Sequence, residues 1–532
     1  MNTAKYVLAM YDIRGKQNFI FKKGKIKEVM GASWIIRDLF DDYLYPNAPG
    51  KGIFNYKNHN DNRFTPDNFK KHLEEGYIGE TIYDGGGNFF VLFRDKETFV
   101  NLNKKFTKTL MEKTYTLKVL CTCIEVETEL KNFEEDRRKL YEKNRVNEAR
   151  ESVTIPSTVL PFTQVDRVTS LPLSIMHDYK YGDGKKEKVS VESEAKLRKY
   201  QEEVRRTESR DIVEFDKMVE NKGVDSMLAI IHIDGNNMGA KVQNALIDHK
   251  TGKQITTYSG SVERLREFSE KIDKIYISQP LGAIDNKLGR NKRAVIYAGD
   301  DFTIICKAKD AFEITKIYFD KINESNNTDV FSSCAGIAIF HSHAPFVDAY
   351  RIAEECCDNA KDFMKKNDIK DACLLDFEYL QAGIEGSLNQ IREGILCSKP
   401  WLYDINNLEH NNLKDKTYVT VKNGDKEYLN QDNIIAAFKN DFNIEDKNEK
   451  IGRGNVKGLA QASLDGEVTF GFEIERITAH TKNNRIKELY KQARSDGNEI
   501  LFRSLVYDCV IFYDQWFLNN SEDTADKNYR GE

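Results

Sequence analysis

The sequence predicts an α+β protein in which a ferredoxin-like unit, β-α-β-β-α-β, occurs twice in tandem. Two observations predict this fold class. From Lys5 onward, segments with strand and helix periodicity follow one another in that order, and the same order starts again at Met227. Short stretches of the two copies also align, with "YDGGGNFFVLF" (83–93) matching "YAGDDFTIIC" (297–306).

The first copy is predicted from alternating apolar strands and amphipathic helices. A glycine turn at Gly85, Gly86 and Gly87 separates its second and third strands. Its predicted elements are a strand at 6–12, a helix at 25–45, strands at 78–84 and 89–93, a helix at 96–112 and a strand at 116–126.

The second copy repeats this order with different turn residues. "MLAIIHIDG" predicts its first strand, "SVERLREFSEKIDKIY" a helix, "RAVIYAG" and "FTIICKA" a hairpin, "DAFEITKIYFDKI" a helix and "CAGIAIF" the last strand. In the alignment Asp12 corresponds to Asp234, whereas Gly87 and Asn88 occupy the places of Asp300 and Asp301. The second copy therefore keeps carboxylates that the first has lost.

The remaining chain predicts an insert and a helical C-terminal region. We expect domains at 1–150 and 226–382, an insert or linker at 151–225, a mainly helical domain at 383–519 and a flexible tail at 520–532. The charged helix of the insert is expected to be solvated and to carry Glu-Lys pairs, rather than to form a nucleic-acid patch. A hairpin is expected around Asn423 and Gly424.

Composition excludes several classes of function. The 532 residues carry a net charge of −5 with a pI near 6.1, so we expect no strong general binding to nucleic acid and none to membranes. No segment has membrane-spanning length, and we expect a cytoplasmic protein. Nine scattered cysteines without C-x-x-C spacing predict buried thiols rather than a zinc site.

Three aspartates are the candidate catalytic and metal-binding residues. Asp234 ends the first strand of the second copy, and Asp300 with Asp301 follows Gly299 in its hairpin. First and third strands are neighbours in a ferredoxin-like sheet, so we expect the three carboxylates to converge. Such a cluster favours a pair of Mg²⁺ or Mn²⁺ ions, which suits phosphoryl transfer. The alternative for the Asp pair is an ordinary hairpin turn.

Residues near these aspartates are candidate nucleotide-binding groups. Gly235 and Gly299 lack side chains where a triphosphate must approach the main chain. Asn236 and Asn237 are either phosphate donors or turn residues. Lys361, on the helix after the fourth strand, either holds phosphates or serves as a surface lysine.

These residues resemble the palm domains of the CRISPR polymerase family, the large subunit of type III CRISPR effector complexes, which is related to GGDEF nucleotide cyclases. The resemblance rests on "YDIRGKQNFIFKKGKIKEVMGASWIIRDL", on "GGGN", on "IDGNNMG" with "YAGDD", and on "AGIAIFHSHAPFVDAYRIAEECCDNAKDF". It implies synthesis of linear or cyclic oligonucleotide second messengers from NTPs, by default ATP. Gly31 and Ser33, with the Gly85–Gly87 turn, would form the acceptor pocket, whereas close helix packing is the alternative for Gly31 and Ser33.

The chain departs from the family pattern in three places. Ala298 replaces the first glycine before the aspartates, the insert lacks the usual cysteine pairs, and the sequence begins almost at the first palm strand, without an HD domain. We therefore expect a stand-alone relative in antiviral signalling, with an effector that reads its product. The alternatives are a non-catalytic nucleotide-sensing or RNA-binding scaffold within a CRISPR ribonucleoprotein and, less favoured, a templated polymerase.

Overall fold

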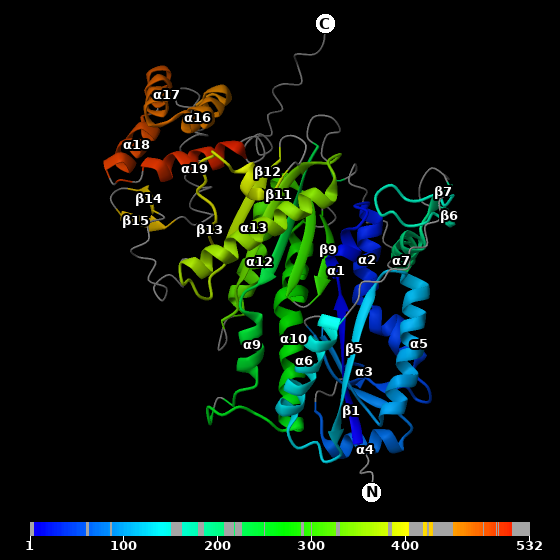
Figure 1. The fold of residues 1–532 in the computed structure, drawn as a ribbon. Helices are drawn as coiled ribbons and strands as arrows, with labels where there is room; N and C mark the ends of the chain where they lie inside the picture. Colours follow the sequence, from blue (N-terminus) through cyan, green and yellow to red (C-terminus); the bar gives the residue numbers. More distant parts are fainter. Residues whose placement is uncertain are drawn as a thin grey trace. The chain divides into compact units, whose positions relative to one another are not determined.

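The structure is a computed structural model of the chain (Figure 1). It describes residues 5–59, 63–85, 88–150, 162–178, 186–206, 218, 226–248, 250–288, 292–298, 300–325, 330–380, 386–403, 419–422, 425–428, 451–481, 484–495, 497 and 499–512. By its contacts the chain divides into two compact units. Unit 1 is Met1–Ile212, Asn237–Gln279 and Val295–Phe302, and unit 2 is Val213–Asn236, Pro280–Ala294 and Thr303–Glu532. The predicted domain boundaries stay predictions.

The first copy of the repeat forms a sheet with the strand order β2-β3-β4-β1-β5. The central strand β1 pairs antiparallel with both β4 and β5, which is the arrangement predicted for a ferredoxin-like unit. Its elements are β1 (Lys5–Arg14), α1 (Lys16–Phe21), α2 (Ile26–Arg37), η1 (Phe40–Leu44), η2 (Tyr45–Asn47), β2 (Ile53–Phe54), α3 (Tyr56–His59), α4 (Pro66–Glu74), β3 (Gly79–Gly85), β4 (Asn88–Phe93), α5 (Lys96–Thr114), β5 (Lys118–Glu127) and α6 (Phe133–Arg150).

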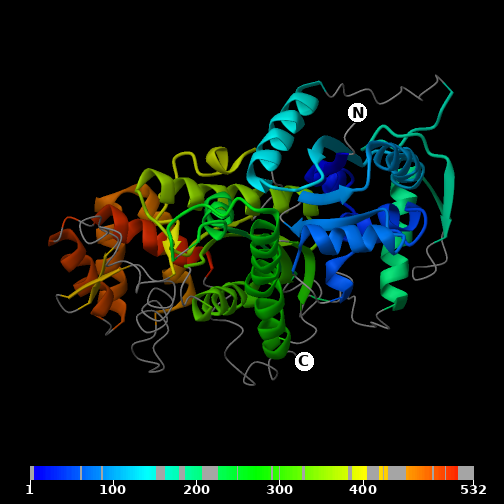
Figure 2. The same ribbon diagram turned by 90° about the horizontal axis from the view of Figure 1, so that it is seen from below.

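Both faces of this sheet are buried by helices. Side chains alternate along β1, so Leu8 and Met10 belong to one apolar cluster while Tyr11 packs against Phe106 of α5 on the other side. Helix α6, cyan in Figures 1 and 2, covers the Leu8 face together with residues of α10 (Tyr258–Asp273). The double coverage explains why β1 is apolar throughout its middle.

The insert contributes a hairpin and a helix to unit 1. These are β6 (Ile175–Asp178), β7 (Lys186–Val189) and α7 (Val191–Arg206). The expected Glu-Lys pairs are present, at Glu192–Lys196 and Lys199–Glu203. The expectation that the helix is solvated is wrong, because α7 packs against α2 and buries Lys196 almost completely. The Lys196 Nζ atom donates to the carbonyl oxygen of Phe19 (2.5 Å) and to a carboxylate oxygen of Glu192 (2.6 Å). These partners compensate the cost of burying the charge.

The second copy forms a six-stranded sheet with the order β13-β12-β11-β8-β10-β9. Strand β8 lies between β11 and β10, as β1 lies between β5 and β4, so the predicted duplication and α+β fold class are confirmed. Its elements are β8 (Met227–Gly235), α9 (Met238–Ala245), α10, η3 (Lys274–Ser278), α11 (Gln279–Leu288), β9 (Lys292–Ala298), β10 (Asp301–Lys307), η4 (Ala308–Asp310), α12 (Ala311–Glu324), β11 (Ser333–His341), α13 (Phe346–Lys366), β12 (Leu374–Tyr379), α14 (Leu388–Ile391) and β13 (Trp401–Leu402).

Helix α13 lies directly on β11, and Figure 1 shows it running along β11 and β12. A glycine makes this approach possible. A Cβ atom at Gly336 would lie 1.9 Å from the carbonyl oxygen of Ala353 on α13. Strand and helix therefore pack closely at the point where α13 carries Lys361 toward the end of β8.

The C-terminal region is mainly helical, as predicted. The predicted hairpin is present as β14 (Val419–Lys422) and β15 (Asp425–Tyr428), whereas its turn residues lie outside the described residues. The helices are α16 (Arg453–Asp465), α17 (Glu467–His480), α18 (Arg485–Ser495) and α19 (Glu499–Ile511). Asp508 of α19 accepts hydrogen bonds from the backbone and the hydroxyl of Ser398 and pairs with Lys399 at 3.3 Å, which joins α19 to the second sheet.

Two expectations from composition can be compared with the structure. Six cysteines, among them Cys306, Cys334 and Cys373, are buried free thiols, as predicted. Among the described residues, none of the helices combines the length and the apolar character needed to cross a bilayer.

Candidate active site

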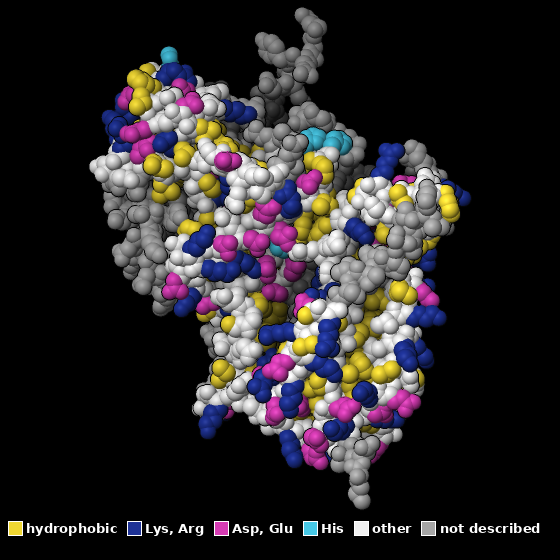
Figure 3. Space-filling model, in the orientation of Figure 1, with side chains coloured by type: hydrophobic (Ala, Val, Ile, Leu, Met, Phe, Trp, Pro, Cys, Tyr) yellow, Lys and Arg dark blue, Asp and Glu magenta, His cyan; other side chains and the backbone are white. Residues whose placement is uncertain are grey.

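Asp234 lies at the end of β8, where its carboxylate faces Lys361 of α13. Lys361 Nζ donates to Asp234 Oδ2 and approaches the carbonyl oxygen of Gly235 at 3.4 Å. Burial lowers the pKa of Lys361, but the neighbouring carboxylate of Asp234 outweighs it, and the pKa is raised. Lys361 is therefore a charged group beside Asp234, as the phosphate-binding alternative requires. Figure 3 shows further acidic side chains gathered over α13.

The residues that follow Asp234 have different roles. Asn236 is buried, and its Nδ2 donates to the hydroxyl of Ser332 (3.1 Å) and to the carbonyl oxygen of Ala372 (3.0 Å). Both amide hydrogens hold the strand end in place, which favours the turn alternative for Asn236, and its nucleotide-binding role stays a prediction. Asn237 is exposed, has a φ of 56° and caps α9, which fits its turn alternative.

Strands β8 and β10 are neighbours, and one side-chain contact relates them. The buried His232 ring lies 3.1 Å, through Nδ1, from the Thr303 hydroxyl. Burial lowers the pKa of His232, although nearby acids including Asp234 oppose this.

Asp300 and Asp301 belong to unit 1, at the turn that opens β10. Both are partly buried. Lys16, the first residue of α1, is close enough to be influenced by their charges and by that of Asp12: burial lowers its pKa, and the three carboxylates oppose that effect. The turn with the two aspartates thus has a basic group nearby to which the sequence analysis gave no role.

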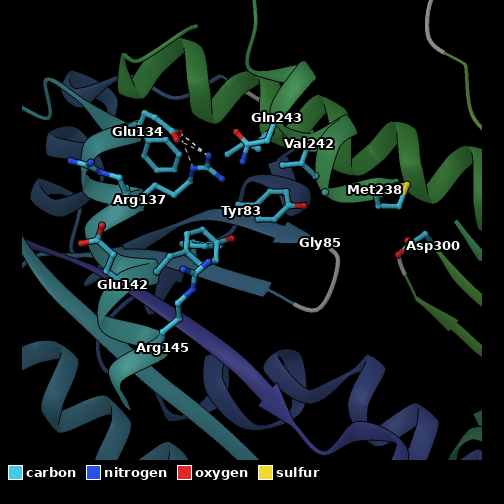
Figure 4. A pocket seen from close by; sticks show the side chains of 16 residues that line it. Tyr83, Gly85, Glu134, Arg137, Glu142, Arg145, Met238, Val242, Gln243 and Asp300 are labelled. Atoms are coloured by element: carbon cyan, nitrogen blue, oxygen red, sulfur yellow. Dashed lines mark hydrogen bonds and ion pairs between the residues drawn. The ribbon is translucent and has the colours of Figure 1, made fainter. Parts of the chain in front are cut away.

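A cavity of about 680 Å³ in unit 1 has Asp300 at one end (Figure 4). Its apolar and aromatic lining includes Tyr83, Phe90 and Leu265, while α6 contributes Arg137 and further charged side chains. The complete lining is Tyr83, Gly85, Phe90, Phe133, Glu134, Arg137, Arg138, Tyr141, Glu142, Arg145, Met238, Gly239, Val242, Gln243, Leu265 and Asp300.

Arg137 is oriented within this cavity by a forked ion pair. Its Nε and Nη2 atoms donate to the two carboxylate oxygens of Glu134 at 2.9 and 2.8 Å. Figure 4 shows the guanidinium directed toward Gln243, while Arg145 enters from lower on the same helix. The cavity therefore combines aromatic walls, cations and one carboxylate at its end.

The first copy balances its carboxylates with basic side chains of its own. Arg14 donates to Asp12 at 3.0 Å and also pairs with Glu148 of α6. Lys57 donates to Asp84 at 2.6 Å, next to the glycine turn. The degenerate character of the first copy stays a prediction.

Helix packing accounts for Gly31. A Cβ atom there would lie 1.9 Å from the carbonyl oxygen of Lys196 on α7, which fits the close-packing alternative, and the role of Gly31 in the acceptor pocket stays a prediction. Ser33 is buried on the same helix, and its nucleotide-binding role stays a prediction. Gly85 lines the cavity, whereas Gly86, Gly87 and Gly299 lie outside the described residues.

Within the part of the chain that the structure describes, no group of three or more His, Cys, Asp or Glu side chains is arranged to hold a metal ion. The donor chemistry nevertheless fits, because the carboxylates of Asp234, Asp300 and Asp301 are the hard oxygen ligands that Mg²⁺ and Mn²⁺ prefer. Their role as metal ligands stays a prediction.

Sequence reasoning missed the contribution of α6 to the cavity. The arginines of this helix recur among acids in a strongly charged segment, which by itself indicates a solvated helix face. Lys16 was missed for a similar reason, since only the fold brings it near Asp300 and Asp301. Gln243 likewise follows no recognisable spacing.

The sequence of residues 227–370 matches the family described as Cas10/Cmr2, second palm domain. This segment contains Asp234, Asp300, Asp301 and Lys361. No curated protein is matched by the chain.

Three solved structures share the fold across most of the chain. An apo Csm1-Csm4 cassette is 12% identical with a TM-score of 0.52, over 95% of this chain and 70% of that one. Csm1 of T. onnurineus is 13% identical with a TM-score of 0.50, over 95% and 69% of the two chains. A Csm1-Csm4 cassette in complex with cA4 is 12% identical with a TM-score of 0.50, over 95% and 69%. Residues 227–370 thus match the second palm domain of the Cas10/Cmr2 family, and the chain shares the fold of Csm1.

Proposed function

We propose that this protein is a metal-dependent nucleotidyltransferase that joins NTPs into a short linear or cyclic oligonucleotide with release of pyrophosphate. The oligonucleotide would act as a second messenger in antiviral, CRISPR-like defence. The observation that carries the proposal is the cavity that ends at Asp300. Its location matters because Asp300 belongs to the pair of aspartates in the matched palm segment.

The cavity has the chemistry that a nucleotide requires. Aromatic and aliphatic side chains such as Tyr83 and Leu265 suit the planar base, and the arginines of α6 suit phosphate groups. Its volume of about 680 Å³ lies within the usual range for small-molecule sites, roughly 300–1,000 Å³. Asp300 at one end is placed to approach the phosphates of a bound nucleotide.

Asp234, Asp300 and Asp301 would hold Mg²⁺ or Mn²⁺. Bound there, such ions supply Lewis-acid chemistry, lowering the pKa of an attacking hydroxyl and balancing the charge of the leaving pyrophosphate. Lys361 now pairs with Asp234, and we propose that it turns to the phosphates when nucleotide binds. The side chain is suited to this exchange because it is partly exposed.

Partners follow from the solved relatives. One of these is a Csm1-Csm4 cassette bound to cA4. We propose that the substrates here are NTPs, with ATP as the family default, and that the partners are CRISPR ribonucleoprotein subunits or an effector that reads the product. The cytoplasm is the compartment in which we place this activity.

The test replaces both aspartates of the turn. Asp300→Ala with Asp301→Ala should lower product formation from a mixture of NTPs and Mn²⁺ by about 100-fold or more, since metal ions contribute several kcal/mol to such reactions. Asp362→Ala, an exposed acid on α13, is the control and should keep full activity. Products are identified by mass spectrometry. Wild-type product formation by the double variant would refute the site.

One observation favours a second candidate, a non-catalytic nucleotide-sensing or RNA-binding scaffold. The carboxylate of Asp234 already has a cation in Lys361, so this acid is balanced without metal. Calorimetry with NTPs and with guide RNA separates the two functions. Tight binding without any product would favour the scaffold, whereas pyrophosphate release would favour the enzyme.

A further inference from the structure

Helix α10 carries Arg266, which is fully buried although it is charged. Three of its hydrogen bonds go to consecutive residues of β3. Nε donates to the carbonyl oxygen of Ile82 (3.0 Å), and Nη2 donates to the carbonyl oxygen of Thr81 (2.5 Å) and to a carboxylate oxygen of Glu80 (3.1 Å). The arginine therefore joins α10 to one short stretch of this strand.

The remaining surroundings of the guanidinium complete its environment. Nη1 donates to the carbonyl oxygen of Arg63 at 3.2 Å, and the guanidinium lies 4.1 Å from the ring centre of Tyr56. A buried cation is costly unless its donors are satisfied, and here each nitrogen has an acceptor. An uncharged apolar residue would suffice at this position if α10 only had to cover apolar surface.

The stretch that Arg266 holds contains a β-bulge. Thr81 pairs with Val91 and Tyr83 pairs with Phe90, so Ile82 is an extra residue on β3. A bulge disrupts the ladder and redirects the side chains that follow it. Arg266 supplies hydrogen-bond donors to the carbonyl groups at this irregularity. The direction of β3 beyond the bulge thus depends on α10.

Ser269, one turn further along α10, reaches the end of the same strand. Its hydroxyl donates to the carbonyl oxygen of Asp84 at 2.7 Å. A Cβ atom at Gly85 would lie 2.5 Å from this hydroxyl, so only glycine fits there without a shift. Tyr83 and Gly85 both line the cavity (Figure 4), whereas neither Arg266 nor Ser269 does.

We propose that Arg266 and Ser269 are positioning residues, which fix the bulge and the end of β3 so that Tyr83 and Gly85 form one wall of the nucleotide site. The inference rests on the proposed function, because it takes the cavity to hold an NTP. Both residues act through β3 and not through contact with the nucleotide. Helix α10 belongs to the segment that matches the second palm domain, and it thereby positions a cavity wall formed by β3 of the first copy.

The test compares two serines of one helix. Ser269→Ala removes the bond to Asp84, and Ser261→Ala removes a bond of 2.9 Å to the carbonyl oxygen of Ile255 that does not reach β3. The Kd of a non-hydrolysable NTP analogue and the KM for NTP should rise roughly three- to tenfold in Ser269→Ala only, the usual effect of one hydrogen bond. Its kcat should stay unchanged.

Two further measurements distinguish positioning from general loss of stability. Hydrogen exchange at the amides of Tyr83 to Gly85 should become faster in Ser269→Ala and remain unchanged in Ser261→Ala. Arg266→Lys keeps the charge but lacks the planar set of donors, so it should raise Kd and exchange further. If Arg266→Lys does not fold, the two serine variants decide alone.

Each outcome decides the inference. Equal Kd values and equal exchange in both serine variants would overturn it, as would faster exchange with an unchanged Kd. Failure of the proposed function gives a different result, because the wild-type protein would then bind the NTP analogue without forming product from NTPs. The comparison of Kd between the two serine variants would still test the positioning role. Wild-type protein that binds no NTP would overturn both proposals.

Discussion

Lys361→Met tests whether the lysine beside Asp234 serves the substrate. Methionine keeps an unbranched side chain of similar length and removes the charge together with the N–H donors of the ammonium group. The matched control is Lys365→Met, one turn further along α13, where the lysine side chain is 77% exposed and pairs with Asp362 at 3.5 Å. Both variants lose one lysine from the same helix, so they differ mainly in the neighbourhood of Asp234.

The structure predicts unequal effects on stability and on substrate use. The side chains of Lys361 and Asp234 are 21% and 37% exposed, so their ion pair resembles a surface pair and contributes about 0.2–1 kcal/mol. A charged hydrogen bond to phosphate contributes more, about 1.5–3 kcal/mol, which corresponds to roughly 10- to 150-fold in KM or kcat/KM. Lys361→Met should therefore leave unfolding nearly unchanged and impair NTP use strongly.

A second expected effect has the opposite sign. Without Lys361, Asp234 is no longer paired, so the concentration of Mn²⁺ that gives half-maximal activity at saturating NTP should fall. Steady-state kinetics over a matrix of NTP and Mn²⁺ concentrations, together with thermal unfolding, measures all three quantities. If Lys361→Met and Lys365→Met behave alike in KM and in metal dependence, Lys361 is a surface lysine and the reasoning is refuted.

Two predictions concern packing. Gly31→Ala should lower the free energy of unfolding by about 1–3 kcal/mol in urea titrations, because its Cβ atom would clash with the carbonyl oxygen of Lys196. A variant that is as stable as the wild type but has a raised KM would favour a place for Gly31 in the acceptor pocket. Lys399→Met should cost about 3–5 kcal/mol at pH 8 by leaving Asp508 unpaired. Burial raises the pKa of Asp508, so the folded state keeps a proton that the unfolded chain releases above about pH 3.9. The loss of stability in Lys399→Met should therefore shrink as the pH falls. A loss of stability that does not change with pH would contradict this reasoning.

The order of strands and helices was predictable because periodicity in each segment reflects which faces are buried. β1 and β8 both read as apolar runs, and both lie at the centre of a sheet that is covered on its faces. The place of Asp234 at the end of such a strand followed directly from this. What periodicity could not supply was the identity of the elements that cover each face.

Three contacts that the sequence did not reveal have this common cause. Helix α7 was expected in solvent because its composition is charged, yet Lys196 is buried by a carbonyl and a carboxylate that other segments provide. Asn236 looked available to phosphate because its partners, Ser332 and Ala372, are about a hundred residues away in sequence. Gly31 has a packing role that depends on the same helix α7. The local sequence shows which residue can donate a hydrogen bond or lacks a side chain, but it does not show which distant atom that residue contacts.

The duplication offers a physical reason why the first copy would be less suited to metal ions than the second. Helices α6 and α13 begin at Phe133 and Phe346, and Glu148 and Lys361 each stand fifteen residues further on (148 − 133 = 361 − 346). Each reaches the aspartate position of its copy: Lys361 pairs with Asp234 directly, whereas Glu148 shares Arg14 with Asp12. The first copy thus carries two acids that share one arginine, so a divalent cation there would have to displace a guanidinium bound by two carboxylates. Asp234 pairs with the ammonium group of Lys361, which in our proposal turns to a phosphate when the substrate arrives. A copy of the first kind can hold a nucleotide, but it is poorly suited to recruit the ions that phosphoryl transfer requires.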